Sequence, residues 1–226
     1  MAPQVAIRSS EVGACGSGVP RLRRLGPTAY EATWRAMQAF NAARLADTAD
    51  EIWITEHEPV YTLGLAGRRE HVLRDNGVPV LKVDRGGQVT YHGPGQLVVY
   101  LLLDLARRGL GVRQLVRTLE TCVIEFLDSC GLSAYAKADA PGVYLTGVAG
   151  EAKIAALGLR VKNGCTYHGL ALNVNMDLSP FVDIDPCGYR GLAVTQLADV
   201  GVARTVEEVG SVLAPLIAAR LPARSS

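Results

Sequence analysis

The sequence lacks the features of metal-binding, nucleotide-binding and membrane-spanning chains. Its five cysteines form no Cys-x-x-Cys pair and its four histidines are scattered, so we expect no metal site. No Gly-x-Gly-x-x-Gly or Gly-x-x-x-x-Gly-Lys follows a strand-like segment, which disfavours dinucleotide binding and P-loop nucleotide binding. The apolar run 97–103 ends at Asp104, far short of the roughly 20 residues that a membrane helix needs.

Excess charge and an export signal are also missing. Lysine and arginine number 23 and aspartate and glutamate 22, which leaves a net charge of +1. We therefore expect neither a nucleic acid nor a membrane surface as partner. The first twenty residues hold one arginine and no apolar core, so we expect no signal peptide and a cytoplasmic location with reduced cysteines.

The remaining composition is that of one globular domain. Hydrophobic residues make up 49% of the 226 residues and charged residues 20%. Residues 1–20 are rich in glycine and serine without periodicity, and we expect them to form a flexible tail. Residues 21–226 are expected to form a single domain without an internal linker.

Periodicity predicts helices that alternate with groups of strands. A capping box at 28–31 predicts a helix through Leu45, apolar 3–4 spacing predicts another at 112–127, and a second capping box at 205–208 predicts a third to about Leu221, kinked or interrupted by Pro215. We expect strands at 51–57, 80–83, 89–92 and 96–103, the last central, and a short helix at 68–74. Strands in hairpins with a few helices indicate an α+β fold rather than a doubly wound one.

The residue pairing of one hairpin can be predicted from the sequence. Asn163-Gly164 lies between strand-like segments 154–161 and 166–174 and predicts a two-residue turn, so that the numbers of paired residues add up to 327. The pairs Gly158/Gly169 and Ala156/Ala171 then share one face, while Leu157/Leu170, Ala155/Leu172 and Leu159/His168 share the other. The small pairs form a groove, which either a ligand or a tightly packed helix or loop would occupy.

Several polar residues have a chemical and a structural interpretation. Cys187 lies in Pro-Cys-Gly, outside any helical stripe, and is the best candidate for an exposed reactive thiol. Lys153 precedes an apolar strand and is either a surface lysine or a partly buried ammonium that lowers a thiol pKa. His92 and His168 are either bases or hydrogen-bonded structural residues.

Four stretches together resemble the lipoyl(octanoyl) transferase family. They are 85–96 (Arg-Gly-Gly-Gln-Val-Thr-Tyr-His-Gly-Pro-Gly-Gln), 153–160 (Lys-Ile-Ala-Ala-Leu-Gly-Leu-Arg), 168–178 (His-Gly-Leu-Ala-Leu-Asn-Val-Asn-Met-Asp-Leu) and 184–188 (Ile-Asp-Pro-Cys-Gly). The resemblance runs from about Arg21 to Leu221 with the motifs in order. It implies an α+β fold like the catalytic domain of biotin and lipoate protein ligases, with a mixed β-sheet flanked by helices.

The resemblance also implies an activity. The donor would be octanoyl-acyl carrier protein, and the acceptors would be lysines on lipoyl domains of 2-oxo-acid dehydrogenase complexes and on the glycine cleavage H protein. Cys187 would carry the acyl thioester and Lys153 would tune its pKa. The implied substrate-binding residues are Arg85, Gly86, Gly87, Gln88, Val89, Thr90, Tyr91, His92, Ala156, Leu157, Gly158, Gly169, Leu170 and Ala171.

Because a thioester donor is already activated, we expect no ATP and no cofactor. We also expect the protein to be a monomer. An acidic carrier protein would favour a basic patch on the surface. Candidates for it are Arg68 and Arg69, or Arg107, Arg108 and Arg113. Three alternatives stay open: an ATP-dependent lipoate or biotin ligase, a non-catalytic acyl-lipid binding module, and a cysteine hydrolase.

Overall fold

The computed structural model describes residues 10–12, 18–147, 150–185 and 192–223. The strands are β1 (Ser10–Val12), β2 (Arg21–Thr28), β3 (Glu51–His57), β4 (Val60–Leu63), β5 (Val80–Lys82), β6 (Val89–His92), β7 (Gln96–Leu102), β8 (Ala134–Ala136), β9 (Gly142–Gly147), β10 (Gly150–Lys162) and β11 (Cys165–Asn173). The helices are α1 (Tyr30–Ala42), α2 (Val112–Ser129) and α3 (Val206–Arg220), with the short 3-10 helices η1 (Arg69–His71), η2 (Ser179–Asp183) and η4 (Ala198–Val200).

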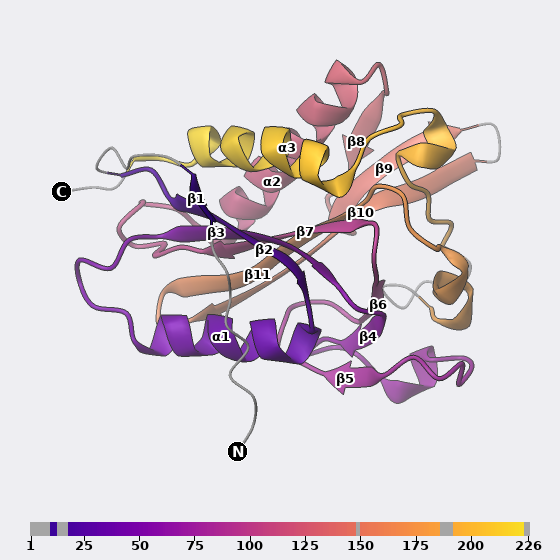
Figure 1. The fold of residues 1–226 in the computed structure, drawn as a ribbon, viewed down its shortest axis with the longest axis horizontal. Coiled ribbons are helices and arrows are strands. Elements are labelled where there is room, and N and C mark those ends of the chain that lie inside the picture. The colour runs from indigo at the N-terminus through magenta and orange to yellow at the C-terminus, as the bar shows by residue number, and fades with distance from the viewer. Residues whose placement is uncertain (1–9, 13–17, 148–149, 186–191, 224–226) are drawn as a thin grey trace.

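An eight-stranded mixed sheet, in the order β1-β2-β3-β7-β11-β10-β9-β8, forms the centre of the molecule. Its neighbouring strands are antiparallel except for the parallel pair β2 and β3. Helices α2 and α3 cover one face, while α1 covers the other together with a small sheet of order β5-β4-β6 (Figure 1). The expected α+β class, a mixed sheet flanked by helices, is confirmed.

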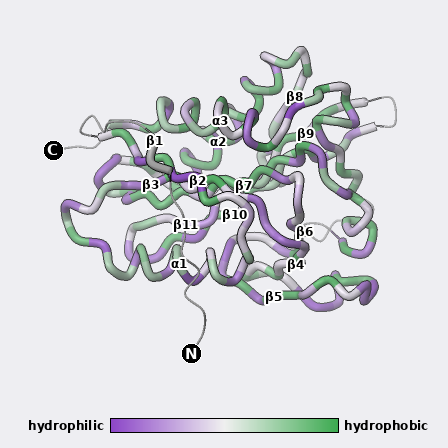
Figure 2. The backbone as a smooth tube through the Cα atoms, viewed as in Figure 1, coloured by the Kyte–Doolittle hydropathy of each residue, from purple (hydrophilic) through white to green (hydrophobic). Residues whose placement is uncertain are grey.

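Strand β7 lies at the centre of the sheet and is covered on both faces, which explains why its sequence is apolar at nearly every position. Leu97, Val99 and Leu101 belong to the large core beneath α2 and α3, whereas Val98 and Tyr100 belong to a second core beneath α1. Every residue of β7 is buried, and the strand is mostly hydrophobic in colour in Figure 2. The predicted central position of this strand is confirmed.

The hairpin of β10 and β11 has the predicted register. Gly158 faces Gly169, Ala156 faces Ala171, and Lys162 faces Cys165 across the turn. Asn163 and Gly164 both have positive φ angles, of 52° and 75°, as a tight hairpin turn of this twist requires.

The first expected helix cap is wrong. Thr28 ends β2, and its Oγ1 lies 2.8 Å from Oγ1 of Thr55 and accepts a hydrogen bond of 2.8 Å from Oγ1 of Thr33. Helix α1 therefore begins at Tyr30, with Ala29 as a cap that makes no side-chain hydrogen bond, and ends at Ala42, before Leu45. The sequence of β2 has no clear alternation, because a bulge beside Gly26 interrupts its pairing with β3.

Three other segments differ from expectation or qualify it. Ser10–Val12, within the expected tail, pairs with β2, and the expected helix at 68–74 is reduced to the single turn η1. The capping box of α3 is confirmed, since Oγ1 of Thr205 accepts from the Glu208 amide at 3.2 Å. Pro215 does not end α3, because the exposed side of the helix leaves the freed carbonyl group open to water.

Candidate functional site

A pocket lies between the start of α1, the loop around residues 85–88 and the strands β7, β11 and β10. It contains about 490 Å³ of space not filled by atoms, part of it open to solvent. Its lining residues are Tyr30, Arg85, Gly87, Gln88, Val89, Thr90, His92, Val98, Tyr100, Ala156, Leu157, Gly158, His168, Gly169, Leu170 and Ala171. The site thus joins segments that lie far apart in sequence.

Most of the predicted substrate-binding residues meet in this pocket. Those that line it are Arg85, Gly87, Gln88, Val89, Thr90, His92, Ala156, Leu157, Gly158, Gly169, Leu170 and Ala171. Gly86 and Tyr91 do not line it. Tyr91 points to the other side of β6 from Thr90 and His92, where it packs on Tyr61 and Phe181.

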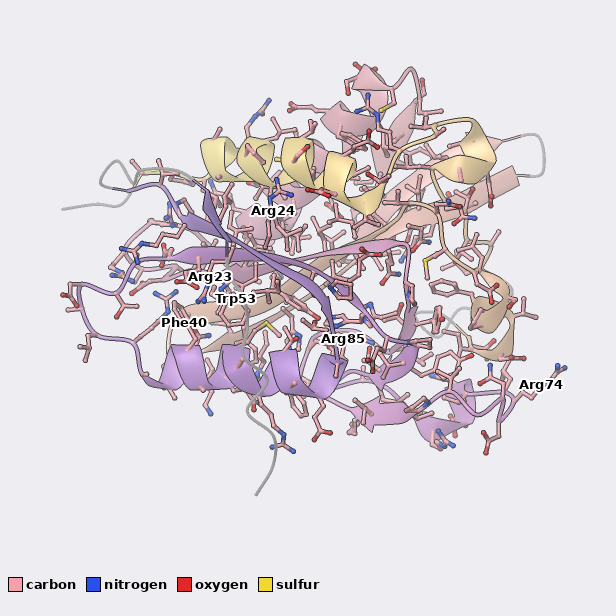
Figure 3. All side chains as sticks on the ribbon, in the orientation of Figure 1. Arg23, Arg24, Phe40, Trp53, Arg74 and Arg85 are labelled. Atoms are coloured by element: carbon pink, nitrogen blue, oxygen red, sulfur yellow. The ribbon has the colours of Figure 1, made fainter. Side chains whose placement is uncertain are left out.

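Arg85 shapes the loop that forms one wall of the pocket. Its side chain is buried between α1 and the small sheet (Figure 3). The guanidinium donates hydrogen bonds to the carbonyl oxygens of Thr62 at 2.7 Å and Gln88 at 2.8 Å, and to Oγ1 of Thr62. A single buried arginine therefore ties the loop to β4.

The small residues of the hairpin serve two different purposes. At Gly158 the loop backbone packs tightly, because a Cβ there would stand 2.9 Å from the carbonyl oxygen of Gly86. The Gly86 amide also donates a 2.9 Å hydrogen bond to the carbonyl of Leu159. At Ala156 and Ala171 the small side chains border the open pocket. The loop thus fills the groove at Gly158, while the groove stays open to the pocket at Ala156 and Ala171.

The predicted alternation fails at His168. This residue has a positive φ of 60°, which turns its ring to the pocket side of the sheet instead of the core face shared with Leu159. The neighbouring Gly169 cannot carry a side chain, because a Cβ would stand 2.0 Å from the carbonyl oxygen of Val99. The hairpin register is therefore correct, but two residues of β11 are rotated relative to a regular strand.

His168 is held by an acidic partner. Its Nε2 lies 3.1 Å from Oδ1 of Asp84, and the Asp84 carboxylate also accepts hydrogen bonds from Trp34 and Tyr167. These donors hold the pKa of Asp84 well below its ordinary value, although its burial acts in the opposite direction. Burial lowers the pKa of His168 and outweighs the effect of Asp84. A negative charge at Asp84 therefore orients the imidazole.

Sequence reasoning missed Tyr30, Val98 and Tyr100 as pocket residues. Tyr100 is the only hydroxyl-bearing residue in the apolar run of β7, and it faces Gly169, so register could have pointed to it. Tyr30 opens α1 and has no comparable signal. Burial raises the pKa of Tyr30 to about 12 and that of Tyr100 well above its ordinary value, so both phenols are uncharged at neutral pH.

The histidines beside these tyrosines are neutral as well. Burial lowers the pKa of His57 to about 4 and that of His92 well below its ordinary value. Nε2 of His57 lies 2.6 Å from the Tyr100 hydroxyl, and Nδ1 of His92 lies 2.7 Å from Oε1 of Gln96. The Gln96 amide nitrogen already donates to Asn173, so His92 carries its proton on Nδ1 and leaves Nε2 unprotonated. Among its titratable side chains, the described part of the pocket lining thus carries a charge only at Arg85.

Lys153 is a buried residue, not a surface lysine. It is 4% exposed, and its Nζ donates to the carbonyl of Pro141 at 3.3 Å and lies 5.0 Å from the ring centre of Tyr144. The pairing of β10 with β9 shifts register between Lys153 and Ala155. This bulge accounts for the orientation of Lys153, whose position in a regular strand would point away from the groove.

Cys187 lies outside the described residues, but the segments on both sides of it are described. Before it, Ile184 forms a β-bridge with Val72, and the Asp185 amide donates to the carbonyl of His71 at 2.9 Å. After it, Val194 bridges Lys153. The chain that follows Cys187 is therefore hydrogen-bonded to the backbone of Lys153 itself.

The exposure of the other cysteines and of the arginines limits the roles that they can have. Cys122 is in the core, and Cys165 is only 8% exposed although it lies directly after the hairpin turn. Arg108 is buried on the carboxylate of Asp50 and is not available to a carrier-binding patch, whereas Arg107 contacts the same carboxylate but is only half-buried. Arg68, Arg69 and Arg113 are exposed, and Arg74 extends away from the molecule (Figure 3). Among the described helices, none is long and apolar enough to cross a membrane.

Comparison with known proteins agrees with this geometry. Residues 29–217 match the model of the lipoyl protein ligase A/B catalytic domain. The octanoyltransferase of Thiobacillus denitrificans is 61% identical over 187 residues, covering 83% of this chain and 84% of that protein. The octanoyltransferase of an Azoarcus species is 56% identical over 224 residues, covering 98% and 97% of the two chains.

Solved structures share the fold at lower identity. A bipartite lipoate protein ligase from Thermoplasma acidophilum aligns with a TM-score of 0.70 at 19% identity, covering 90% of this chain and 84% of that one. A lipoate-protein ligase A bound with ATP aligns with a TM-score of 0.72 at 17% identity, over 89% and 85%. At 56–61% identity over most of their length, the octanoyltransferases are much nearer in sequence. The chain therefore belongs to the octanoyltransferases, acyl-transferring enzymes of the lipoyl protein ligase A/B catalytic domain family.

Proposed function

We propose that this enzyme moves an octanoyl group from octanoyl-acyl carrier protein to a lysine of a lipoyl domain, through a thioester on Cys187. The acceptors are lipoyl domains of 2-oxo-acid dehydrogenase complexes and the glycine cleavage H protein. The observation that carries this proposal is the buried Lys153, whose backbone pairs with residues 193–195 beyond Cys187, at the end of the strand that lines a largely apolar pocket.

In the first half-reaction, the Cys187 thiolate attacks the carbonyl carbon of the donor thioester. The sulfur–carbon bond to the carrier breaks, and the leaving carrier thiolate takes up the proton of the Lys153 ammonium, which becomes neutral. A cysteine of ordinary pKa, about 8.5, is only a few per cent thiolate at pH 7. A neighbouring ammonium favours the thiolate, which is the role we assign to Lys153.

In the second half-reaction, the target lysine amine attacks the acyl-enzyme. A nitrogen–carbon bond forms, the bond to the Cys187 sulfur breaks, and the amine loses one proton. Lys153 in its neutral form accepts that proton and returns to the ammonium form. No ATP enters either step, because both acyl donors are thioesters.

The pocket suits the octanoyl chain, because its one charged group among the described titratable side chains, Arg85, is hydrogen-bonded to the loop and to β4. Ala156, Ala171 and Val98 give it apolar walls, and its tyrosines and histidines are neutral. Each methylene buried from water contributes roughly 0.8 kcal/mol. Six inner methylenes would thus contribute about 5 kcal/mol before the cost of ordering the chain is subtracted.

The test is transfer in a defined mixture of enzyme, octanoyl-acyl carrier protein and a lipoyl domain, without ATP. The mass of the lipoyl domain is expected to increase by one octanoyl group. A requirement for ATP would instead indicate a ligase. Release of free octanoate without modified domain would indicate a hydrolase, and binding without turnover would indicate an acyl-lipid binding module.

A further inference from the structure

A carboxylate that the proposed chemistry does not use lies buried beneath β9. Glu120 projects from α2, whose other buried residues are apolar or a cysteine, and it is only 6% exposed. Its Oε1 accepts a 3.0 Å hydrogen bond from the backbone amide of Gly142. A buried carboxylate in an apolar helix face costs free energy, so its position calls for a specific partner.

The partner on the other side of the same peptide group is Lys153. Nζ of Lys153 donates to the carbonyl of Pro141, and this carbonyl belongs to the peptide bond whose N–H binds Glu120. One peptide group therefore has an ammonium at its oxygen and a carboxylate at its nitrogen. Both charges are aligned with the peptide dipole, and such hydrogen bonds polarise and strengthen one another.

Close packing makes this arrangement dependent on glycine. Gly142 has a φ of 147°, and a Cβ on it would stand 2.9 Å from Cε and 3.1 Å from Nζ of Lys153. The lysine side chain thus lies directly on the Gly142 backbone. Any shift of this backbone would move the ammonium as well.

Few other charged groups face this pair among the described residues. Arg117, on the same helix, acts on Glu120 together with Lys153. Glu151 on β10 acts on Lys153, but its carboxylate is hydrogen-bonded to Lys137 and Tyr135. The Tyr144 ring covers the ammonium from β9. Burial raises the pKa of Glu120, while the Gly142 amide, Arg117 and Lys153 lower it.

We propose that Glu120 is a positioning residue for Lys153, acting through the Pro141–Gly142 peptide group. It fixes where the ammonium lies, and its charge favours the protonated form of Lys153. This inference rests on the proposed role of Lys153 in accepting the proton of the target amine. Because transfer then requires neutral Lys153, the rate rises with pH, and Glu120 sets the midpoint of that rise.

The test is the pH profile of transfer from pre-formed acyl-enzyme to a lipoyl domain, in single turnover. Glu120→Gln keeps an oxygen for the Gly142 amide but removes the charge, so we expect the midpoint to fall by about one pH unit. The matched control is Glu125→Gln on the same helix, whose carboxylate pairs with Arg220 at the surface. The control is expected to keep the wild-type midpoint. A folded Glu120→Gln enzyme with the wild-type midpoint would overturn the inference.

A second measurement does not depend on the folding of a Glu120 variant. Coupling between two sites is reciprocal, so loss of the ammonium must also change the titration of Glu120. The Gly142 amide resonance reports that titration. In Lys153→Met it is expected to titrate at higher pH than in the wild type, whereas an unchanged titration would overturn the inference.

Failure of this inference and failure of the proposed function give different results. If Cys187 becomes acylated and Lys153→Ala impairs transfer, the proposed function stands whatever the Glu120 variants do. If Cys187 is never acylated, the proposed function fails before the pH profile is measured.

Discussion

Lys153 and Val194 form a parallel β-bridge that ties the segment after Cys187 to the strand bearing the buried lysine. Two hydrogen bonds make the bridge, from the Lys153 amide to the Ala193 carbonyl at 2.8 Å and from the Thr195 amide to the Lys153 carbonyl at 3.0 Å. The same strand, β10, then lines the pocket at Ala156 and Gly158. Lys153, one wall of the pocket and the pairing partner of residues 193–195 thus belong to the same strand.

Lys153→Ala is expected to impair both half-reactions. Loss of the ammonium removes the charge that favours the Cys187 thiolate, so the pH midpoint of Cys187 alkylation should rise toward the ordinary thiol pKa of about 8.5. Alkylation rates measured from pH 5 to about 10 would show the shift. Lys162→Ala, at the exposed end of the same strand, is the control and should leave the profile unchanged. An unchanged profile with normal transfer in Lys153→Ala would remove Lys153 from the mechanism.

Ala171→Leu and Ala156→Leu are expected to change chain-length selectivity. Both positions border the pocket, so a larger side chain should occupy space otherwise filled by the end of the acyl chain. Relative kcat/KM for hexanoyl and octanoyl donors should shift toward the shorter chain, with each lost methylene contact weakening octanoyl binding by roughly 0.8 kcal/mol.

The control for these variants is Ala39→Leu on the exposed side of α1, which should not change selectivity. If the pocket variants fold and still prefer octanoyl, the acyl chain does not lie across β10 and β11.

Asp50→Asn is expected to destabilise the fold strongly. The Asp50 carboxylate is fully buried and forms ion pairs with Arg44 at 3.0 Å and Arg108 at 2.6 Å. Removing one partner of a buried ionic cluster leaves uncompensated charge and costs about 3–5 kcal/mol. The free energy of unfolding in urea measures this cost. Glu31→Gln, which breaks the exposed pair with Arg35, should cost less than about 1 kcal/mol, and equal effects of the two substitutions would contradict this account.

Stability is expected to fall as the solution becomes acidic through the histidine range. His57 has a folded-state pKa of about 4, below its ordinary value of 6.5, so the unfolded chain binds protons more readily between these values. The stabilisation is complete above pH 6.5 and is lost as the pH falls toward 4, by up to about 1.4 kcal/mol per pH unit for one group. The lowered pKa values of His92 and His168 act in the same direction.

His57→Gln isolates the share of one histidine. It should reduce the slope of unfolding free energy against pH in this window without reversing it, since His92 and His168 remain. Urea unfolding curves at several pH values measure the slope. A variant with the wild-type slope would mean that His57 keeps an ordinary pKa in the folded protein.

The sequence predicts local pairing better than it predicts side-chain direction. The Asn163-Gly164 turn is enough to fix the β10–β11 register, because a two-residue loop leaves one way to pair the strands. The rotation of His168 could not be predicted, since the groups that contact its ring, Asp84 and Tyr30, come from distant segments. The same holds for Thr28, which has the local pattern of a helix cap but bonds to Thr55 on the neighbouring strand.

The pocket itself could be predicted only where a motif marks it. The 85–92 and 156–158 stretches carry glycines at which the loop and strand backbones meet, and these are visible in the sequence. Tyr30 and Glu120 carry no such mark, because the hydrogen-bond partner of each is distant along the chain.

The central claim is that Cys187 carries the acyl group, and the mass of the intact enzyme tests it most directly. After mixing with octanoyl-acyl carrier protein and no acceptor, the wild-type enzyme and the Cys165→Ser control should each gain one octanoyl group. Cys187→Ser should fold and gain none. A peptide map that places the octanoyl group on Cys187 is the predicted result, and an adduct on another cysteine, or an unmodified enzyme that still transfers, would contradict it.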